Sequence, residues 1–293
     1  MPASALALVL VAGLIHASWN ILAKQASGDA RFALFTSIFL AIFWAPVGIW
    51  IAWDVVPGWG WREWLLIVVT GVLHVGYYVI LLRGYRKADL TVVYPMARGS
   101  GPLLSSLVAL IFLDEEVSGL GIAGIAGVVL GVFLIAGGPK LLRKASDPAH
   151  RKRVHVGIAY GLLTGVFISS YTVVDGYAVK FMLMSPILVD YMGNFVRLAV
   201  LAPAYFVDKV SAVALWKQQW KYALAVGVIS PVSYVLVLYA MRLAPISHVA
   251  PAREVSMLFA AIIGGHLLNE GDRVQRFIGA LFIAVGVSAL ALG

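Results

Sequence analysis

Three charged residues stand inside otherwise apolar stretches, where they could bind a charged ligand. Arg98 lies in VVYPMARGSGP, and Arg253 and Glu254 are neighbours in VAPAREVSM. If these stretches cross a bilayer, each charge costs about 3 kcal/mol or more, so it needs a partner or a function. Two hypotheses follow. Either Arg98 or Arg253 binds the carboxylate of a ligand, or pairs such as Arg98–Glu254, and Arg197 with an acid, hold the structure together.

Prolines and glycines flank these charges and predict interrupted helices. Pro95 and Pro251 precede the charges by two or three residues, and a proline removes one backbone hydrogen bond from a helix. Gly99, Gly101 and Pro102 weaken the helix around Arg98 further. We therefore expect hinges at these five positions, where the exposed N-terminal dipole of a broken helix could hold an anionic group.

Aromatic and polar side chains could line a cavity around the charges. His74 and Tyr78 lie one helical turn apart and share a face. Such rings, with a few hydrogen-bonding groups, suit an amphipathic zwitterion, although each residue alone could equally form an interhelical hydrogen bond. The residues expected to bind a substrate are His16, Trp19, Asn20, His74, Tyr78, Tyr94, Arg98, Tyr171, Ser230, Tyr234, Arg253 and Glu254.

Two further acids, Asp175 and Asp190, lie within a turn or two of expected helix ends, so we expect their side chains to reach water. Asp190, Asn194 and Arg197 share one helix face. If the protein carries protons, Glu254 and His74 are the first candidates, because a carboxyl or an imidazole can exchange a proton.

The elements that position these residues are apolar helices. Hydrophobic residues make up 61% of the 293 residues and charged residues 12%, about half of what a soluble domain carries. The N-terminus lacks the basic region of a cleaved signal, so we expect it to form the first span. Ten stretches have the length and polarity of membrane spans: 3–24, 31–53, 62–82, 91–112, 119–138, 156–179, 185–207, 218–241, 245–267 and 274–292.

Basic residues predict the orientation of these spans. Of the 22 Lys and Arg residues, 16 fall in the connections after spans one, three, five, seven and nine, and the basic linker 139–155 holds six of them. The opposite side holds Arg62, Lys180 and Arg242. Since positive loops stay in the cytoplasm, we expect both termini on the outer, periplasmic side of a bacterial inner membrane.

The two halves of the chain repeat each other at an offset of 156 residues. Because five spans is an odd number, the second copy, 156–293, must be inverted relative to the first, 1–138. Inverted repeats are typical of secondary transporters, whose halves rock about a midplane site. The offset aligns Gly71 with Gly227, Tyr78 with Tyr234, Arg86 with Arg242 and Pro95 with Pro251, and after one gap Leu113, Glu115, Gly124 and Gly131 with Leu268, Glu270, Gly279 and Gly286.

This pattern resembles the drug/metabolite transporter superfamily, and within it the EamA-type repeat. The resemblance rests on HASWNILAK in the first span, on the acidic exits FLDEEVS and LLNEGDR, and on the two five-helix halves. It is closest to the amino-acid exporters, which implies an all-α protein of ten transmembrane helices. The second copy of the first motif, ISSYTVVDGYAVK, departs from the pattern at Asp175 and Gly176, so a role is not carried over there.

Other chemistries are not expected. The glycines from Gly119 to Gly124 have dinucleotide-binding spacing, but they open an apolar span and follow no strand, so they indicate close helix packing. No phosphate-binding P-loop occurs, and the histidines are scattered over different spans without metal-ligand spacing. The net charge of +8 reflects cytoplasmic loops and not nucleic-acid binding. We expect no cofactor, no metal and no nucleic acid, with a small-molecule substrate and the lipid bilayer as partners of a monomer or weak homodimer.

The sequence therefore predicts an exporter of small amphipathic metabolites, neutral or aromatic amino acids first, and not an enzyme. One alternative is a proton-coupled exporter of cationic drugs, which needs an unpaired acid in its cavity; Glu254 beside Arg253 is too neutralised for that. A membrane-embedded transferase is the third hypothesis. The residues that come nearest to a catalytic site are Asp114–Glu116. They are partly repeated in the second half at Asn269 and Glu270, so we expect them to be loop residues that follow the repeat.

Overall fold

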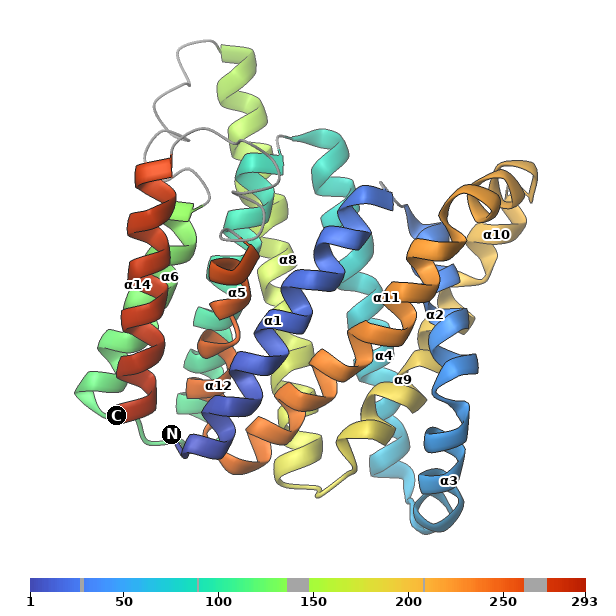
Figure 1. Ribbon diagram of the computed structural model, residues 1–293, viewed down its shortest axis with the longest axis horizontal. Helices are drawn as coiled ribbons and strands as arrows, with labels where there is room; N and C mark the ends of the chain where they lie inside the picture. The colour runs from blue at the N-terminus through green and yellow to red at the C-terminus, as the bar shows by residue number, and fades with distance from the viewer. Residues whose placement is uncertain (27–28, 89, 136–147, 208, 261–272) are drawn as a thin grey trace.

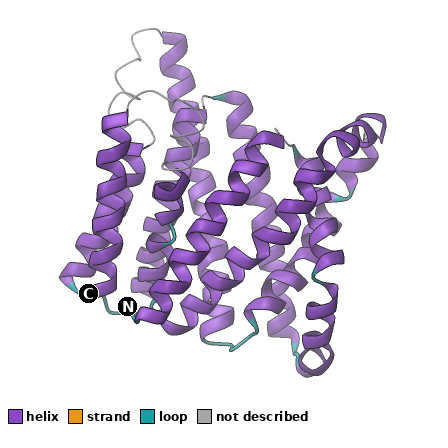
Figure 2. Ribbon diagram, viewed as in Figure 1, coloured by secondary structure: helices purple, strands orange, loops and turns teal. Residues whose placement is uncertain are grey.

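The computed structural model describes the chain except residues 27–28, 89, 136–147, 208 and 261–272, and every regular element in the described part is helical (Figures 1 and 2). Each stretch expected to be a span contains at least one helix. The first half comprises α1 (Ala3–Ala26), α2 (Ala30–Phe43), α3 (Ala45–Val55), the short 3₁₀ helix η1 (Val56–Gly58), α4 (Trp61–Lys87), α5 (Leu90–Phe112) and α6 (Gly119–Ile135). The second half comprises α8 (Pro148–Lys180), α9 (Pro186–Leu201), α10 (Pro203–Val207), α11 (Lys209–Leu243), α12 (Ile246–Ala252) and α14 (Arg273–Leu292).

Three of the expected spans are interrupted: 31–53, 185–207 and 245–267. The third break is described with the site below, and the first two correct the prediction of single helices there. The stretch 31–53 bends by 66° between α2 and α3, where Pro46 starts the new helix and the Trp44 indole donates a hydrogen bond to the Val228 carbonyl. The stretch 185–207 divides at Ala202, in front of Pro203. In both places the proline lacks the N–H that would continue the helix.

The basic linker is shorter than the sequence suggests. Its residues 139–147 lie outside the described part of the chain, but the residues from Pro148 to His155 already form the first turns of α8. The polar composition of this segment led to its assignment as a loop. A helix that continues beyond the apolar thickness of a bilayer can carry such residues, because water satisfies them there.

Both chain termini lie at one end of the helix bundle (Figure 1). The Met1 ammonium donates a hydrogen bond of 2.9 Å to the Ala291 carbonyl oxygen. We call this the outer end, and the opposite end, where α6 ends and α8 begins, the inner end. Termini on the same side require an even number of crossings, as the sequence predicts; the assignment of the outer end to the periplasm stays a prediction.

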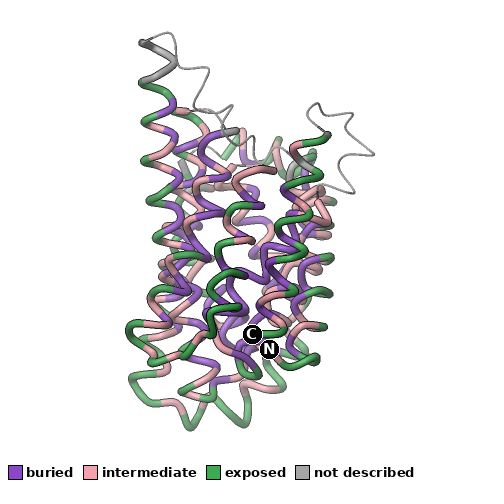
Figure 3. Tube along the Cα trace, turned by 90° about the vertical axis from the view of Figure 1, so that its left-hand side faces the viewer, coloured by how far each residue is buried: buried purple, intermediate pink, exposed green. Residues whose placement is uncertain are grey.

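Exposed residues face outward along the helices (Figure 3), and many of them are large and apolar. Trp50 and Trp53 are 74% and 79% exposed, and lipid is the environment that suits such side chains. By length and composition α1, α4, α8 and α11 can each cross a bilayer, and α2 with α3 can form one bent span. The helix α6 and the segment 277–292 are apolar but shorter. The protein is therefore a multi-pass membrane protein, and the count of ten crossings stays a prediction.

The helix contacts reflect the inverted repeat. The helix α1 packs along α11, and the equivalent pair, α8 and α4, packs in the same way. Between α6 and α14 a Cβ atom on Gly131 would lie 2.6 Å from the Gly279 carbonyl oxygen, and one on Gly124 would lie 2.8 Å from that of Gly286. The offset aligns Gly124 with Gly279 and Gly131 with Gly286, so the two contacts are equivalent. Missing side chains let these helices approach closely, as expected for small residues in membranes.

Candidate functional site

A buried ion pair joins the two halves at the centre of the molecule. The Nη2 atom of Arg98 on α5 lies 2.8 Å from Oε2 of Glu254, and the two side chains are only 8% and 1% exposed. Arg98 also donates a hydrogen bond to the Ser256 hydroxyl at 3.2 Å. Since Arg98 and Glu254 are equivalent in the repeat, their contact places the pair at the axis that relates the halves. The structure thus contains the ion pair that one sequence hypothesis required.

The helix that carries Arg98 is continuous, which corrects the expected hinge there. The helix α5 runs from Leu90 to Phe112 with Pro95 and Pro102 inside it. Prolines are tolerated in membrane helices where neighbouring helices and hydroxyl groups support the backbone. Close packing against α8 provides that support at Gly101, where a Cβ atom would lie 2.7 Å from Ile168. Gly99 is also buried, yet a Cβ atom there would meet nothing within 4 Å, so open space lies beside Arg98.

The helix is interrupted close to Pro251, and the role of this break as a hinge stays a prediction. The helix α12 ends at Ala252, residues 253–254 form a turn, and residues 255–260 are helical again. The Glu254 amide bonds to the Pro251 carbonyl at 2.9 Å and the Met257 amide to the Glu254 carbonyl at 2.8 Å, both with 3₁₀ spacing. Such a tightened turn inside a helix often marks a hinge. The remainder of the span predicted over 245–267, from residue 261 on, lies outside the described residues.

Arg253 occupies this break and differs from Arg98. Its side chain is buried, 5% exposed, and among the described residues no acid lies within ion-pair distance of it, in contrast to Arg98. The Nε atoms of both arginines are buried without a hydrogen-bond acceptor. Glu254 lies within electrostatic reach of Arg253, but it is already paired with Arg98. Two guanidinium groups and one carboxylate therefore leave one positive charge unbalanced. We call Arg98, Arg253 and Glu254 the central cluster.

Aromatic rings surround the central cluster. His16 lies within electrostatic reach of both arginines, and its ring meets Trp19 edge-on at 4.7 Å. On the other side the His74 ring stacks on Tyr171 at 4.1 Å, and Tyr234 meets His74 edge-on at 5.5 Å. Tyr94 lies within electrostatic reach of Arg98 and Glu254. The structure thus brings His16, Trp19, His74, Tyr94, Tyr171 and Tyr234 together around Arg98, Arg253 and Glu254.

Three of the expected residues have other contacts. The Tyr78 hydroxyl donates to the Asp29 carbonyl at 3.0 Å, and so points to the connection after α1 and away from His74. The Asn20 amide donates to the carbonyl of His16 on its own helix at 2.7 Å. Ser230 is partly buried and makes no side-chain hydrogen bond among the described residues. These three positions are not part of the ring cluster.

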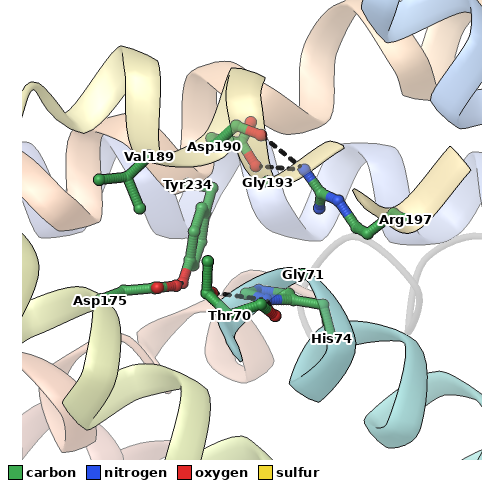
Figure 4. A pocket seen from close by; sticks show the side chains of 9 residues that line it. All are labelled: Thr70, Gly71, His74, Asp175, Val189, Asp190, Gly193, Arg197 and Tyr234. Atoms are coloured by element: carbon green, nitrogen blue, oxygen red, sulfur yellow. Dashed lines mark hydrogen bonds and ion pairs between the residues drawn. The ribbon is translucent and has the colours of Figure 1, made fainter. Parts of the chain in front are cut away.

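A narrow crevice adjoins the ring cluster, with about 160 Å³ of space between atoms (Figure 4). In it Asp175 of α8 and Tyr234 of α11 point toward one another, and the Tyr234 hydroxyl donates a hydrogen bond to Asp175 Oδ2. The residues that line the crevice are Thr70, Gly71, His74, Asp175, Val189, Asp190, Gly193, Arg197 and Tyr234.

The expectation that Asp175 and Asp190 reach water is wrong. Asp175 is fully buried and Asp190 is 6% exposed. Asp190 forms an ion pair with Arg197, which lies on the same face of α9, and the distance between Oδ1 and Nη2 is 2.7 Å. Sequence position placed both acids near helix ends, but the packing of α4, α9 and α11 around them closes the path to solvent.

Several site residues were missed. The Tyr77 ring, and not that of Tyr78, contacts Tyr171, at 5.8 Å. Ser233 accepts a hydrogen bond from the Trp19 indole at 3.4 Å, and Thr70 bonds the His74 imidazole. Helical spacing could have suggested Tyr77, which lies three residues after His74 and shares its face as well as Tyr78 does. In the described part of the chain, no three His, Asp or Glu side chains are placed to hold a metal ion.

Glu115, in the connection between α5 and α6, closes the outer end. Its carboxylate accepts hydrogen bonds from the Ile246 and Ser247 amides at 2.8 and 2.9 Å, and from Lys180 Nζ at 2.8 Å. Partial burial would raise the pKa of Glu115, but the bonds from Lys180, Ser247 and Ile246 outweigh it and lower that pKa. The equivalent Glu270 lies outside the described residues. We call these contacts the Glu115 cap.

A fold of this kind occurs in solved structures. One crystal structure with 17% sequence identity has a TM-score of 0.76, over 100% of this chain and 98% of that chain. At this identity the likeness shows the fold alone. The sequence itself matches the EamA-like transporter family twice, over residues 3–137 and 155–292. The chain therefore belongs to the EamA-like transporter family, and each match covers one of its halves.

Proposed function

We propose that this transporter exports small amphipathic metabolites that carry a carboxylate, neutral and aromatic amino acids first, by alternating access around the central cluster. The family supports transport across a membrane. The cargo and the direction are our inference from the site and from the resemblance to amino-acid exporters described above.

The observation that carries this proposal is the unbalanced charge of Arg253. Among the described residues this guanidinium group has no acid within ion-pair distance, and its Nε atom is buried without an acceptor, which is costly. A ligand carboxylate would satisfy it with two parallel hydrogen bonds. The rings of His16, Trp19 and Tyr171 provide apolar and edge contacts for the rest of an amphipathic ligand. A zwitterion with a ring or an aliphatic side chain matches both features.

The arrangement also supports an alternating-access mechanism. The crevice is too narrow to hold even a water molecule, so the helices must separate before a ligand enters there. The Glu115 cap ties α8 and α12 together at the outer end. The break at residues 253–254 provides a place where the second half can bend. These features fit a closed conformation between two open ones.

The test is transport by purified protein in liposomes. The panel contains phenylalanine, leucine, and phenylalanine amide, which keeps the ring and the amine but lacks the carboxylate. We expect flux of the two amino acids above empty liposomes, little flux of the amide, and loss of flux in Arg253→Gln. Arg62→Gln, a change at an exposed residue at the start of α4, is the matched control. Absence of flux for every amino acid would overturn the proposal.

A second candidate function is export of cationic compounds, and Asp175 favours it. Such a transporter needs an acid in its cavity that is not neutralised, and Asp175 meets that requirement, whereas Glu254 does not. The same liposomes separate the two candidates if phenethylamine, a ring with an amine and no carboxylate, joins the panel. Flux of phenethylamine that requires Asp175, without flux of phenylalanine, would favour the cationic cargo.

A further inference from the structure

Asp175 is a buried carboxyl group that the proposed carboxylate site does not use. It lies on α8, five residues before Lys180, and none of its surface is exposed. The Tyr234 hydroxyl bonds Oδ2, while Oδ1 is buried and has no hydrogen-bond partner. The unpartnered oxygen belongs to a residue that lines the crevice. The sequence marks the position too, since the first-half motif HASWNILAK has no acid.

No cation pairs with Asp175 in the described part of the chain. Arg197 is the nearest candidate, but it is bonded to the carboxylate and the backbone carbonyl of Asp190. Arg197 and Asp190 act on Asp175 with opposite signs. Arg253 acts on His74 and Tyr234, which line the same crevice as Asp175. The titratable and charged groups around Asp175 are His74 from α4, Asp190 and Arg197 from α9, and Tyr234 from α11.

An isolated carboxylate in such surroundings is far more costly than the neutral acid, so the group takes a proton instead. We propose that Asp175 is a proton-binding site, protonated in this closed conformation, which releases its proton when the helices around the crevice separate. The O–H bond of the carboxyl breaks, the proton passes to water that enters the opened crevice, and the carboxylate is then hydrated. Rebinding of a proton allows the crevice to close again.

The size of the crevice favours a proton over an ammonium group as the occupant. The nine residues that line the crevice leave no room for a water-sized group, so an amine with its carbon substituents does not fit beside Asp175. A proton needs no space, and the Tyr234 hydroxyl leaves Oδ1 free to carry it. Proton binding is therefore compatible with the closed conformation, and binding of a cationic substrate at Asp175 requires an open one.

The binding of a proton by Asp175 does not depend on the proposed function. Only the effect of that proton on substrate transport rests on it. If an open crevice exposes Asp175 to one side of the membrane at a time, a proton crosses with each cycle. One unit of pH difference would then change the steady-state ratio of substrate concentrations about tenfold, because it is worth about 1.4 kcal/mol. Intramembrane acids of this kind commonly belong to proton pathways.

The first experiment detects the proton directly by infrared spectroscopy of the protein in lipid. We expect a C=O stretching band of a protonated carboxyl in the wild type at neutral pH, its absence in Asp175→Asn, and a shifted band in Tyr234→Phe, which lacks the donor to Oδ2. Asp54→Asn is the matched control, because it removes a carboxyl group at an exposed position of α3 that does not line the crevice, so the band should stay unchanged. Wild type without the band, or a band that persists in Asp175→Asn, would overturn the proposal.

The second experiment uses liposomes with the membrane potential held at zero. In the wild type an imposed pH difference should shift the substrate ratio about tenfold per unit. Asp175→Asn should still exchange substrate for substrate but give a ratio near one at every pH difference, and Asp175→Glu should restore part of the response. An unchanged response in Asp175→Asn contradicts the proposal.

The two experiments separate the proton site from the cargo. If no member of the panel is exchanged, the proposed function fails, and the infrared band still decides the state of Asp175. If exchange occurs and the band is absent, the proton site alone fails. Should Asp175→Asn not fold, Asp175→Glu and Tyr234→Phe still move the band, because each alters the carboxyl or its donor.

Discussion

Glu254 and Asp175 are both buried acids in the second half of the chain, and the protein accommodates them in different ways. Glu254 faces the Arg98 guanidinium at 2.8 Å, so it keeps its charge and joins the two halves. Asp175 meets a tyrosine hydroxyl and no cation. A paired charge is fixed, since losing either partner leaves the other buried alone. An acid with a neutral partner can change its charge when its surroundings change, which suits a group that takes part in a cycle.

The two halves differ at the same place. The 156-residue offset aligns Asp175 of α8 with Trp19 of α1. The Trp19 indole donates to the Ser233 hydroxyl, whereas Asp175 accepts from Tyr234. The inverted repeat thus gives the two halves equivalent positions here, and only the second half has an acid at its position. A proton-dependent step would act on one half of the molecule.

The largest effect is expected for Glu254→Gln. Because Arg98 would stay buried without its counter-charge, the free energy of unfolding should fall by about 3–5 kcal/mol. Thermal or denaturant unfolding of the purified protein in lipid nanodiscs measures this. The double variant Arg98→Met, Glu254→Met should recover most of the loss, since neither charge remains. A single variant as stable as the wild type would contradict the assignment of a structural pair.

Arg253→Gln should weaken substrate binding without lowering the free energy of unfolding, in contrast to Glu254→Gln. Loss of a charged hydrogen-bond donor to the substrate carboxylate costs about 1.5–3 kcal/mol, roughly ten- to a hundredfold in Kd. Stability should not fall, because this side chain has no partner to lose among the described residues. Binding of phenylalanine by calorimetry, with unfolding measured in parallel, tests both parts. Equal losses of stability and affinity would make Arg253 a structural residue.

A smaller contrast is expected between Asp190→Asn and Asp175→Asn. The first leaves Arg197 without its partner, but that side chain is 19% exposed, so the cost should be about 1–3 kcal/mol. The second keeps an acceptor for the Tyr234 hydroxyl and removes no ion pair, so stability should stay within about 1 kcal/mol. Unfolding curves of the two variants, measured side by side, decide this. The reverse order would mean that Asp175 is ionised and paired.

The smallest effect concerns the Glu115 cap and pH. Because the pKa of Glu115 is lowered below its usual 4.5, the cap is fully formed above that pH and is lost as pH falls through the lowered pKa. The chain has no cysteine, so spin labels at Ser118→Cys and Leu243→Cys report the separation of the outer end without competing sites. Their distance distribution should widen on acidification. Glu115→Gln should remove this pH response, and an unchanged response there would exclude the cap as its cause.

The fold was largely predictable because span length and polarity are local properties of the chain. The ten apolar stretches all contain helices, and the repeat register correctly paired equivalent positions such as Gly124 and Gly279. Helix continuity was less predictable. Pro203 divides a span while Pro95 does not, since α5 has the support of α8 along its length.

The sequence predicted which charged residues belong to the candidate site, but it did not predict which side chains contact one another there. The sequence identified Arg98, Arg253 and Glu254 as charges that need an explanation. It also chose Tyr78, by its alignment with Tyr234, although the Tyr78 hydroxyl bonds a distant carbonyl. Helical spacing admits both Tyr77 and Tyr78, and the rotation of α4 against α8 decides which ring enters the cluster.

By itself, the sequence determined that this protein is an all-helical membrane protein built from two related halves, because hydropathy, charge bias and repeat register can all be read along one chain. Only the tertiary structure decided which charges are balanced. Arg98 meets Glu254 across 156 positions of sequence, Arg253 beside it meets no acid, and Asp175 is sealed from water. Electrostatic energy depends on distance and burial in space, and neither is a property of a residue's neighbours in the chain.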